Sequence, residues 1–117
     1  FKFALTPLYK DIQEYDKQFA PYVDMVILQI PHYVNYYDTA VETAVQNIKL
    51  VNPDAIVLVQ LIPRDRTTEV NIDPTTIINS YKSVQDHVDG VSLFYYDSPD
   101  PVPIIEQFYQ GIGIPAK

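Results

Sequence analysis

Asp54-Ala-Ile-Val-Leu-Val-Gln-Leu-Ile-Pro63 is an aliphatic run, rich in valine and isoleucine, between an aspartate and a proline. A continuous apolar run of this length indicates a strand that is buried on both faces, as in parallel sheets covered by helices. The proline cannot donate a hydrogen bond to a neighbouring strand, so it marks the end of the strand. Segments 24–31 and 89–97 follow the same plan, and residues 1–7 form a shorter version of it. The chain therefore repeats one kind of strand.

Helical periodicity fills the intervals between these strands. Apolar residues recur at spacings of three and four within 8–22, 39–51, 74–88 and 101–109. Thr39-Ala-Val-Glu42 predicts a capping box, and Asp73-Pro74 and Asp100-Pro101 each predict an N-cap followed by a proline at the first helical position. We expect helices to begin within two residues of Thr39, Pro74 and Pro101.

The alternation of strands and helices predicts an α/β fold of four consecutive βα repeats with a parallel sheet and right-handed crossovers. We interpret residues 1–117 as a single (βα)4 domain, which could be a fragment or half of a larger barrel. Two architectures fit: half of a TIM-type barrel, completed by a second copy or by a missing half, or a small open doubly wound sheet. The near-equivalence of the strands favours the half-barrel. Six strand side chains are expected to be buried: Val26, Leu28, Ile56, Leu58, Val91 and Leu93.

Composition narrows the classes of function. The net charge is −7 and the chain has only two arginines, which disfavours binding to nucleic acid or to anionic membranes. No apolar stretch is long enough to predict a membrane span, and no motif predicts a metal or another cofactor. Ten tyrosines and few lysines favour an exported protein, extracellular or at the cell surface.

Three segments resemble the C-terminal half of secreted (βα)8-barrel glycoside-hydrolase-like proteins. They are Leu28-Gln29-Ile30-Pro31, Asn52-Pro-Asp-Ala-Ile-Val-Leu-Val-Gln60-Leu61 and Asp89-Gly-Val-Ser-Leu-Phe-Tyr-Tyr96. The resemblance extends from Tyr22 to Ile112 and implies a barrel. Such hydrolases use paired carboxylates at strand ends, whereas Gln29 and Gln60 are amides, so the resemblance implies a barrel more than it implies hydrolysis.

Glycoside hydrolysis needs two carboxylates that flank one bond. Asp97 is the best single candidate for the acid or base, because it directly follows a predicted strand, although it could instead shape the turn before Ser98-Pro99. Asp65 lies between Arg64 and Arg66, which would lower its pKa and suit a nucleophile. The two arginines suit recognition of a carboxylate or phosphate, or they could pair with acidic residues of their own loop.

Further polar and aromatic residues near strand ends could bind a carbohydrate. Gln29 and Gln60 could hydrogen-bond to sugar hydroxyls, and His32 could bind a hydroxyl or act as a base. Aromatic rings stack on the apolar faces of sugars, for which the candidates are Tyr33, Tyr95 and Tyr96. Core or interface packing is the alternative role of these tyrosines.

Two functions remain open from the sequence. The first is a carbohydrate-binding or carbohydrate-processing domain of an exported protein, which self-associates or joins a missing barrel half. The second is a non-catalytic structural or interaction domain of an extracellular assembly, which the lack of paired strand-end carboxylates supports.

Overall fold

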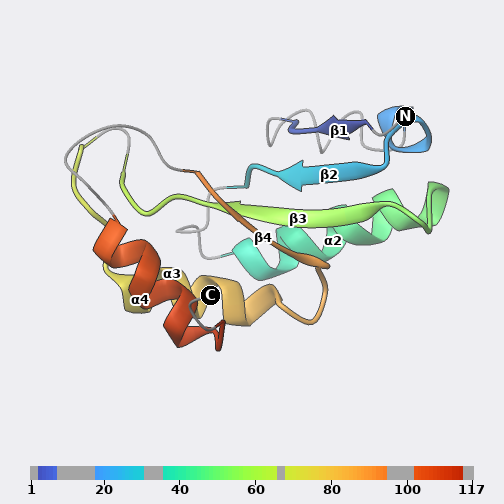
Figure 1. The fold of residues 1–117 in the computed structure, drawn as a ribbon. Coiled ribbons are helices and arrows are strands. Elements are labelled where there is room, and N and C mark those ends of the chain that lie inside the picture. The colour runs from blue at the N-terminus through green and yellow to red at the C-terminus, as the bar shows by residue number, and fades with distance from the viewer. Residues whose placement is uncertain (1–2, 8–17, 31–35, 66–67, 95–101, 115–117) are drawn as a thin grey trace.

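A computed structural model of the chain describes residues 3–7, 18–30, 36–65, 68–94 and 102–114 (Figure 1). The four strands are β1 (Ala4–Leu5), β2 (Met25–Leu28), β3 (Ile56–Leu61) and β4 (Gly90–Leu93). The helices are α2 (Tyr37–Val51), α3 (Pro74–Val84) and α4 (Val102–Gly111), and a short 3-10 helix, η1 (Ala20–Tyr22), precedes β2. The predicted α/β class, with a parallel sheet whose strands alternate with helices, is confirmed.

The strands lie in the order β1-β2-β3-β4, and each is parallel to its neighbours. Right-handed crossovers keep their helices on one face when a sheet grows in one direction. Accordingly, α2, α3 and α4 lie on the same side of the sheet (Figure 1), and α3 contacts both α2 and α4. The sheet is not closed, so it is compatible with half of a barrel or with a small open sheet.

The hydrophobic core lies between the sheet and these helices. The strands β2 and β3 contribute alternate residues to it: Val26, Leu28, Val57, Val59 and Leu61. The helices contribute Val41, Ala44, Ile48, Ile77, Val84, Ile104 and Phe108. Alternation along β2 and β3 shows that one face of each strand is buried completely and the other is not.

The predicted burial of six strand side chains is therefore confirmed only in part. Val26 and Leu28 are fully buried, but Ile56 is 44% exposed, which contradicts the prediction. Leu58, Val91 and Leu93 are half-buried. Ile56 and Leu58 point to the face opposite the helices, because they alternate with the core residues of β3. The expectation that these strands are buried on both faces is wrong for the described part of the chain.

The predicted helix starts are confirmed. Helix α2 begins two residues before Thr39, α3 begins at Pro74, and α4 is described from Val102 onward. The Asp73 side chain accepts a hydrogen bond from the Thr75 N–H at 2.8 Å, as expected of an N-cap. The prediction of a capping box at Thr39 is wrong, because α2 starts earlier and Thr39 lies within its first turn.

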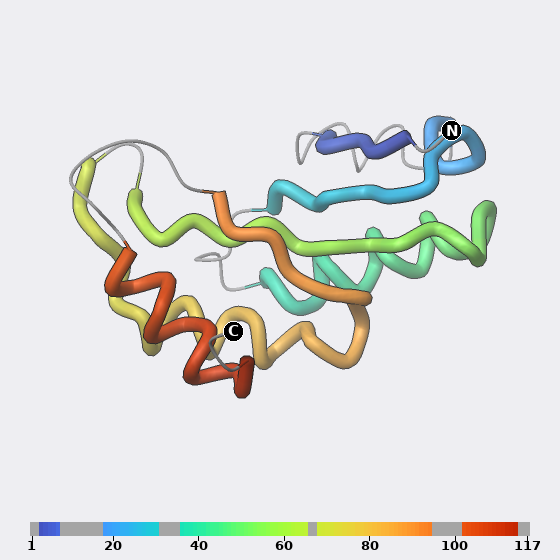
Figure 2. Tube along the Cα trace, in the orientation of Figure 1, coloured from blue at the N-terminus to red at the C-terminus, as the bar shows by residue number. Residues whose placement is uncertain are grey.

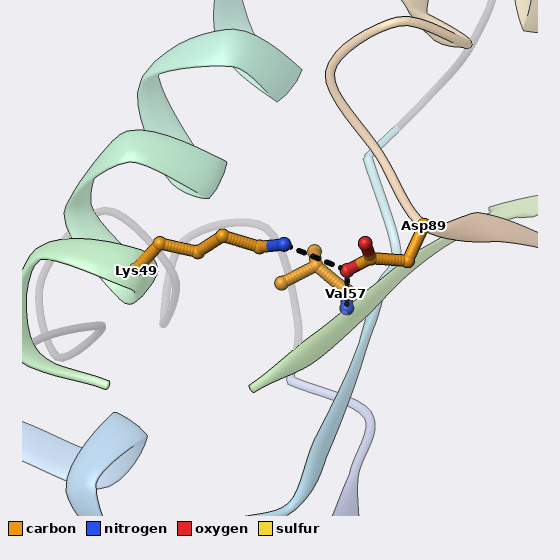
Figure 3. Close-up of polar contacts among 3 residues, drawn as sticks. All are labelled: Lys49, Val57 and Asp89. Carbon is orange, nitrogen blue, oxygen red and sulfur yellow. Dashed lines mark hydrogen bonds and ion pairs between the residues drawn. The ribbon is translucent and has the colours of Figure 1, made fainter. Parts of the chain in front are cut away.

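Two aspartates fix the amino-terminal ends of β2 and β4, each against the strand that precedes it in the sheet. The Asp89 N–H donates to the Val57 carbonyl at 2.8 Å, and its Oδ2 accepts from the Val57 N–H at 2.8 Å and from Lys49 Nζ at 2.9 Å (Figure 3). Asp24 makes the same pair of backbone contacts with Phe3, at 2.8 and 2.7 Å. The Val57 N–H, followed by Lys49, holds the pKa of Asp89 below its usual value. Each aspartate thus sets the register of its strand against the preceding strand.

The third aspartate of the sequence repeat, Asp54, lies one position earlier than the other two. Ile56 pairs with Met25, so Ala55 occupies the place that Asp24 holds before β2. The Ile56 N–H instead donates to the Asp24 carbonyl at 3.0 Å. The repeated aspartates therefore have a structural role at β2 and β4, and β3 is positioned through its backbone.

Candidate functional site

The carboxyl ends of β2, β3 and β4 point toward the same edge of the sheet (Figure 2). Parallel α/β folds place their binding sites at this edge, in the loops that follow the strands. Among the described residues, this edge holds the ends of the strands, the first turn of α2 and the loop between β3 and α3. We refer to it as the carboxyl edge.

A row of polar side chains crosses the sheet at the carboxyl edge, on the face opposite the described helices, which we call the uncovered face. Gln60 pairs with Ser92, and one step beyond the Leu28–Val59 pair Gln29 lies opposite Gln60. Paired residues of neighbouring parallel strands share a face, so Gln29, Gln60 and Ser92 lie side by side. We call these three residues the polar row. All three are half-buried.

Apolar residues form the same face below the polar row. Ile27, Leu58 and Gly90 occupy the next position down, and Met25 and Ile56 the one after that. A Cβ atom at Gly90 would lie 3.0 Å from Leu58 Cδ2, which shows that Leu58 leans over β4. The face thus changes from apolar to polar toward the carboxyl edge. Amide and hydroxyl groups there can donate and accept hydrogen bonds, as a ligand rich in hydroxyl groups requires.

The Gln29 side chain makes a hydrogen bond to the backbone beside β1. Gln29 Nε2 donates to the Thr6 carbonyl at 3.2 Å, which ties the end of β1 to β2. Gln29 therefore has a structural contact as well as a place in the predicted site. Gln60 lies at the centre of the row, between Gln29 and Ser92.

The segment after β3 folds back on itself between Pro63 and Ile72. Arg64 and Asn71 form an antiparallel bridge, and the Ile72 N–H donates to the Pro63 carbonyl at 2.9 Å. Asp65 closes the turn: its Oδ1 accepts from the Thr68 N–H at 2.9 Å. Asp65 therefore shapes the loop through its carboxylate, and its predicted role as a nucleophile stays a prediction.

Arg64 is the buried charged residue of this loop, with 6% of its surface exposed. Its Nη1 donates to Asn71 Oδ1 at 3.2 Å, whereas its Nε is buried and has no acceptor in the part of the chain that the structure describes. Tyr37, at the start of α2, is also buried, and burial raises the pKa of its phenol above the usual value. The phenol of Tyr37 is therefore neutral near neutral pH.

The other predicted site residues lie outside the described residues. They are His32, Tyr33, Arg66, Tyr95, Tyr96 and Asp97. Sequence reasoning missed two residues that the structure places at the carboxyl edge. Ser92 carries a detectable signal, since it is a lone hydroxyl in an apolar strand, whereas Asn71 carries none, because only the folded loop brings it to Arg64.

Three or more potential metal ligands do not gather anywhere in the described ranges. Within the same ranges, no helix is long and apolar enough to cross a membrane. The sequence matches no protein-family model, and comparison with curated proteins and with solved structures finds no significant match either.

Proposed function

We propose that this chain is a carbohydrate-binding, glycoside-hydrolase-like half of a (βα)8 barrel from an exported protein. The observation that carries the proposal is the polar row at the carboxyl edge of an uncovered, otherwise apolar sheet face. In a complete barrel, this face would line the interior and the polar row would form the floor of the site.

Carbohydrate is the ligand class that fits this combination best. Sugars present hydroxyl groups, which amides bind as donors and acceptors, and apolar faces, which aromatic rings cover. The polar row supplies two amides and a hydroxyl. Tyr33, Tyr95 and Tyr96 follow β2 and β4 in the sequence and are proposed to supply the stacking surfaces.

Hydrolysis requires a carboxylate pair, and in the described part of the chain the polar row contains none. Asp65 uses one carboxylate oxygen to close its own turn. A catalytic role therefore depends on Asp97 together with a carboxylate from the other half of the barrel. Binding is the primary proposal, and catalysis would follow only in the completed barrel.

The test is binding of neutral oligosaccharides to the chain, screened on a glycan array and measured by calorimetry. Gln60→Leu keeps the size of the side chain but removes its donor and acceptor, so it should weaken binding about tenfold or more. Gln107→Leu makes the same change at an exposed position of α4 and serves as the matched control. Absence of binding to every neutral glycan, or equal binding by both variants, would refute the proposal.

Completion of the barrel is proposed to come from a second copy or from a missing half of the same protein. The edge strands β1 and β4 each have one side without a partner strand in the described sheet, and eight strands close a barrel of this type. Sedimentation velocity over a wide concentration range tests self-association. A monomer at every concentration, with melting that does not depend on concentration, would exclude the second copy.

A structural or interaction domain is the second candidate function. It is favoured by the partly exposed apolar residues of the uncovered face, of which Ile56 is 44% exposed. This function predicts self-association without glycan binding. The two assays above therefore separate the candidates.

A further inference from the structure

Arg64 combines deep burial with an incomplete set of hydrogen bonds. Only 6% of its surface is exposed, its Nη1 donates to Asn71 Oδ1 at 3.2 Å, and its Nε has no acceptor among the described residues. A guanidinium group stays charged at any physiological pH, so its burial is costly unless an opposite charge or further acceptors compensate.

No compensating carboxylate is found among the described residues. The ion pair observed there, between Lys49 and Asp89, lies at the opposite end of the sheet. Asp65, the neighbour of Arg64 in the sequence, directs its Oδ1 to the Thr68 N–H. The charge of Arg64 is therefore not neutralised within the described part of the chain.

The bond to Asn71 leaves one edge of the guanidinium group without a partner among the described residues. It occupies Nη1 and holds the plane of the group against the returning strand of the loop. The side edge, formed by Nε–H and Nη2–H, carries two parallel donors that are spaced to match two oxygens of a carboxylate or phosphate.

We propose that the side edge of Arg64 binds an oxyanion, a carboxylate or phosphate group of a ligand, at the carboxyl edge of the sheet. Asn71 acts as a positioning residue, because it orients the guanidinium group and does not touch the anion. This site is independent of the proposed carbohydrate function, since it rests on the loop after β3 and not on the polar row.

The low arginine content of the chain permits a direct test. Arg64 and Arg66 are the only arginines, so the 15N–1H spectrum holds two arginine Nε–H signals, and Arg64→Lys assigns them. The chain is titrated with sodium phosphate, sodium glucuronate or neutral glucose at constant ionic strength. We expect a saturable shift of the Arg64 signal with phosphate, glucuronate or both, and none with glucose.

Arg64→Lys retains the charge but loses the two-donor edge, so the affinity for the anion should fall about tenfold or more. Because this variant lacks the Arg64 signal, the affinities of all variants are compared by isothermal titration calorimetry. Lys82→Met removes an exposed cation of α3 and should leave the affinity unchanged. Asn71→Ala retains the guanidinium group and should weaken binding through loss of its orientation. A response to phosphate alone or to glucuronate alone identifies the source of the oxyanion, and either response supports the site.

Three results would overturn the proposal: an Arg64 signal that does not respond to either anion, a response that never saturates, or unchanged affinity in Arg64→Lys. The first two are read on the unmodified chain, so they do not depend on whether the variants fold. Binding of neutral glycans that is lost in Gln60→Leu but retained in Arg64→Lys would leave the carbohydrate proposal intact. Anion binding without any glycan binding would support the oxyanion site and refute the carbohydrate proposal.

Discussion

Replacing Asp89 with alanine tests whether the aspartate contacts at the amino-terminal edge hold the sheet together. The change removes the bonds of Oδ2 to the Val57 N–H at 2.8 Å and to Lys49 Nζ at 2.9 Å. It keeps the backbone bond from the Asp89 N–H to the Val57 carbonyl. The variant therefore isolates the contribution of the carboxylate.

The expected loss follows from the two bonds. A hydrogen bond from a backbone N–H to a charged acceptor contributes about 1.5–3 kcal/mol, and an exposed ion pair contributes about 0–1 kcal/mol. The Asp89 side chain is 39% exposed, so solvent screens both contacts. We expect Asp89→Ala to lower the free energy of unfolding by about 1–2 kcal/mol. Lys49→Met, which removes the ion pair alone, should lower it by less than about 1 kcal/mol.

The loss should depend on pH in a definite direction. The pKa of Asp89 is lowered in the folded state, first by the Val57 N–H and then by Lys49. Its contribution is therefore fully present above the unfolded pKa of about 4 and is lost as the pH falls through the folded pKa. Urea denaturation at fixed protein concentration, at neutral pH and in acid, measures this difference. Equal destabilisation at both pH values, or a loss below about 0.5 kcal/mol at neutral pH, would refute the reasoning.

Three further substitutions test the packing, each by urea denaturation. Leu58→Ala should lower the free energy of unfolding by about 1–2 kcal/mol, because Leu58 is half-buried and a fully buried leucine typically contributes about 2–5 kcal/mol. A larger loss at high protein concentration would indicate that a partner covers Leu58. Gly111→Val should destabilise by about 1–3 kcal/mol, because a Cβ at this position would clash with the Ile78 side chain, and no loss would mean that α3 and α4 are not in contact there. Asn52→Ala should lower the free energy of unfolding by about 1–3 kcal/mol, because the Asn52 Nδ2 donates to the carbonyls of Ala20 and Val23 at 2.9 Å each. A smaller loss than that of Gln107→Leu would contradict these contacts.

Local signals made the element order predictable. Asp73-Pro74 begins a helix through a side-chain acceptor and a fixed backbone angle, and both operate within a few residues. The start of α2 was predicted within two residues, but for the wrong reason. Thr39 fits a capping box by residue type, yet the helix extends two residues further toward its amino terminus, to the buried Tyr37.

The strand sequences did not predict which side chains point toward the helices and which point away from them. Residues 56–59 of β3 are all apolar, so this part of the strand contains no alternation and does not indicate which residues meet the helices. Only the three-dimensional structure distinguishes Val57, which is fully buried, from Ile56, which is 44% exposed. For the site, Gln29 and Gln60 were predicted because polar residues stand out in apolar strands. The pairing of Arg64 with Asn71 depends on the turn of a loop, which no periodic pattern encodes.

The unexpected exposure of one sheet face bears on the completeness of the fold. Met25, Ile27, Ile56 and Leu58 lie on that face, and covering the remaining exposed surface of each would contribute about 1 kcal/mol. Two copies that close a barrel would cover eight such side chains and gain about 8 kcal/mol, whereas association itself costs about 4–15 kcal/mol. Burial of the apolar face would therefore offset most of the free-energy cost of association. Whether two copies associate would then depend on the hydrogen bonds between β4 of one copy and β1 of the other. The described sheet is apolar on both faces and carries its described helices on one, so the strength of edge-to-edge strand pairing is the quantity that separates half of a barrel from a small open sheet.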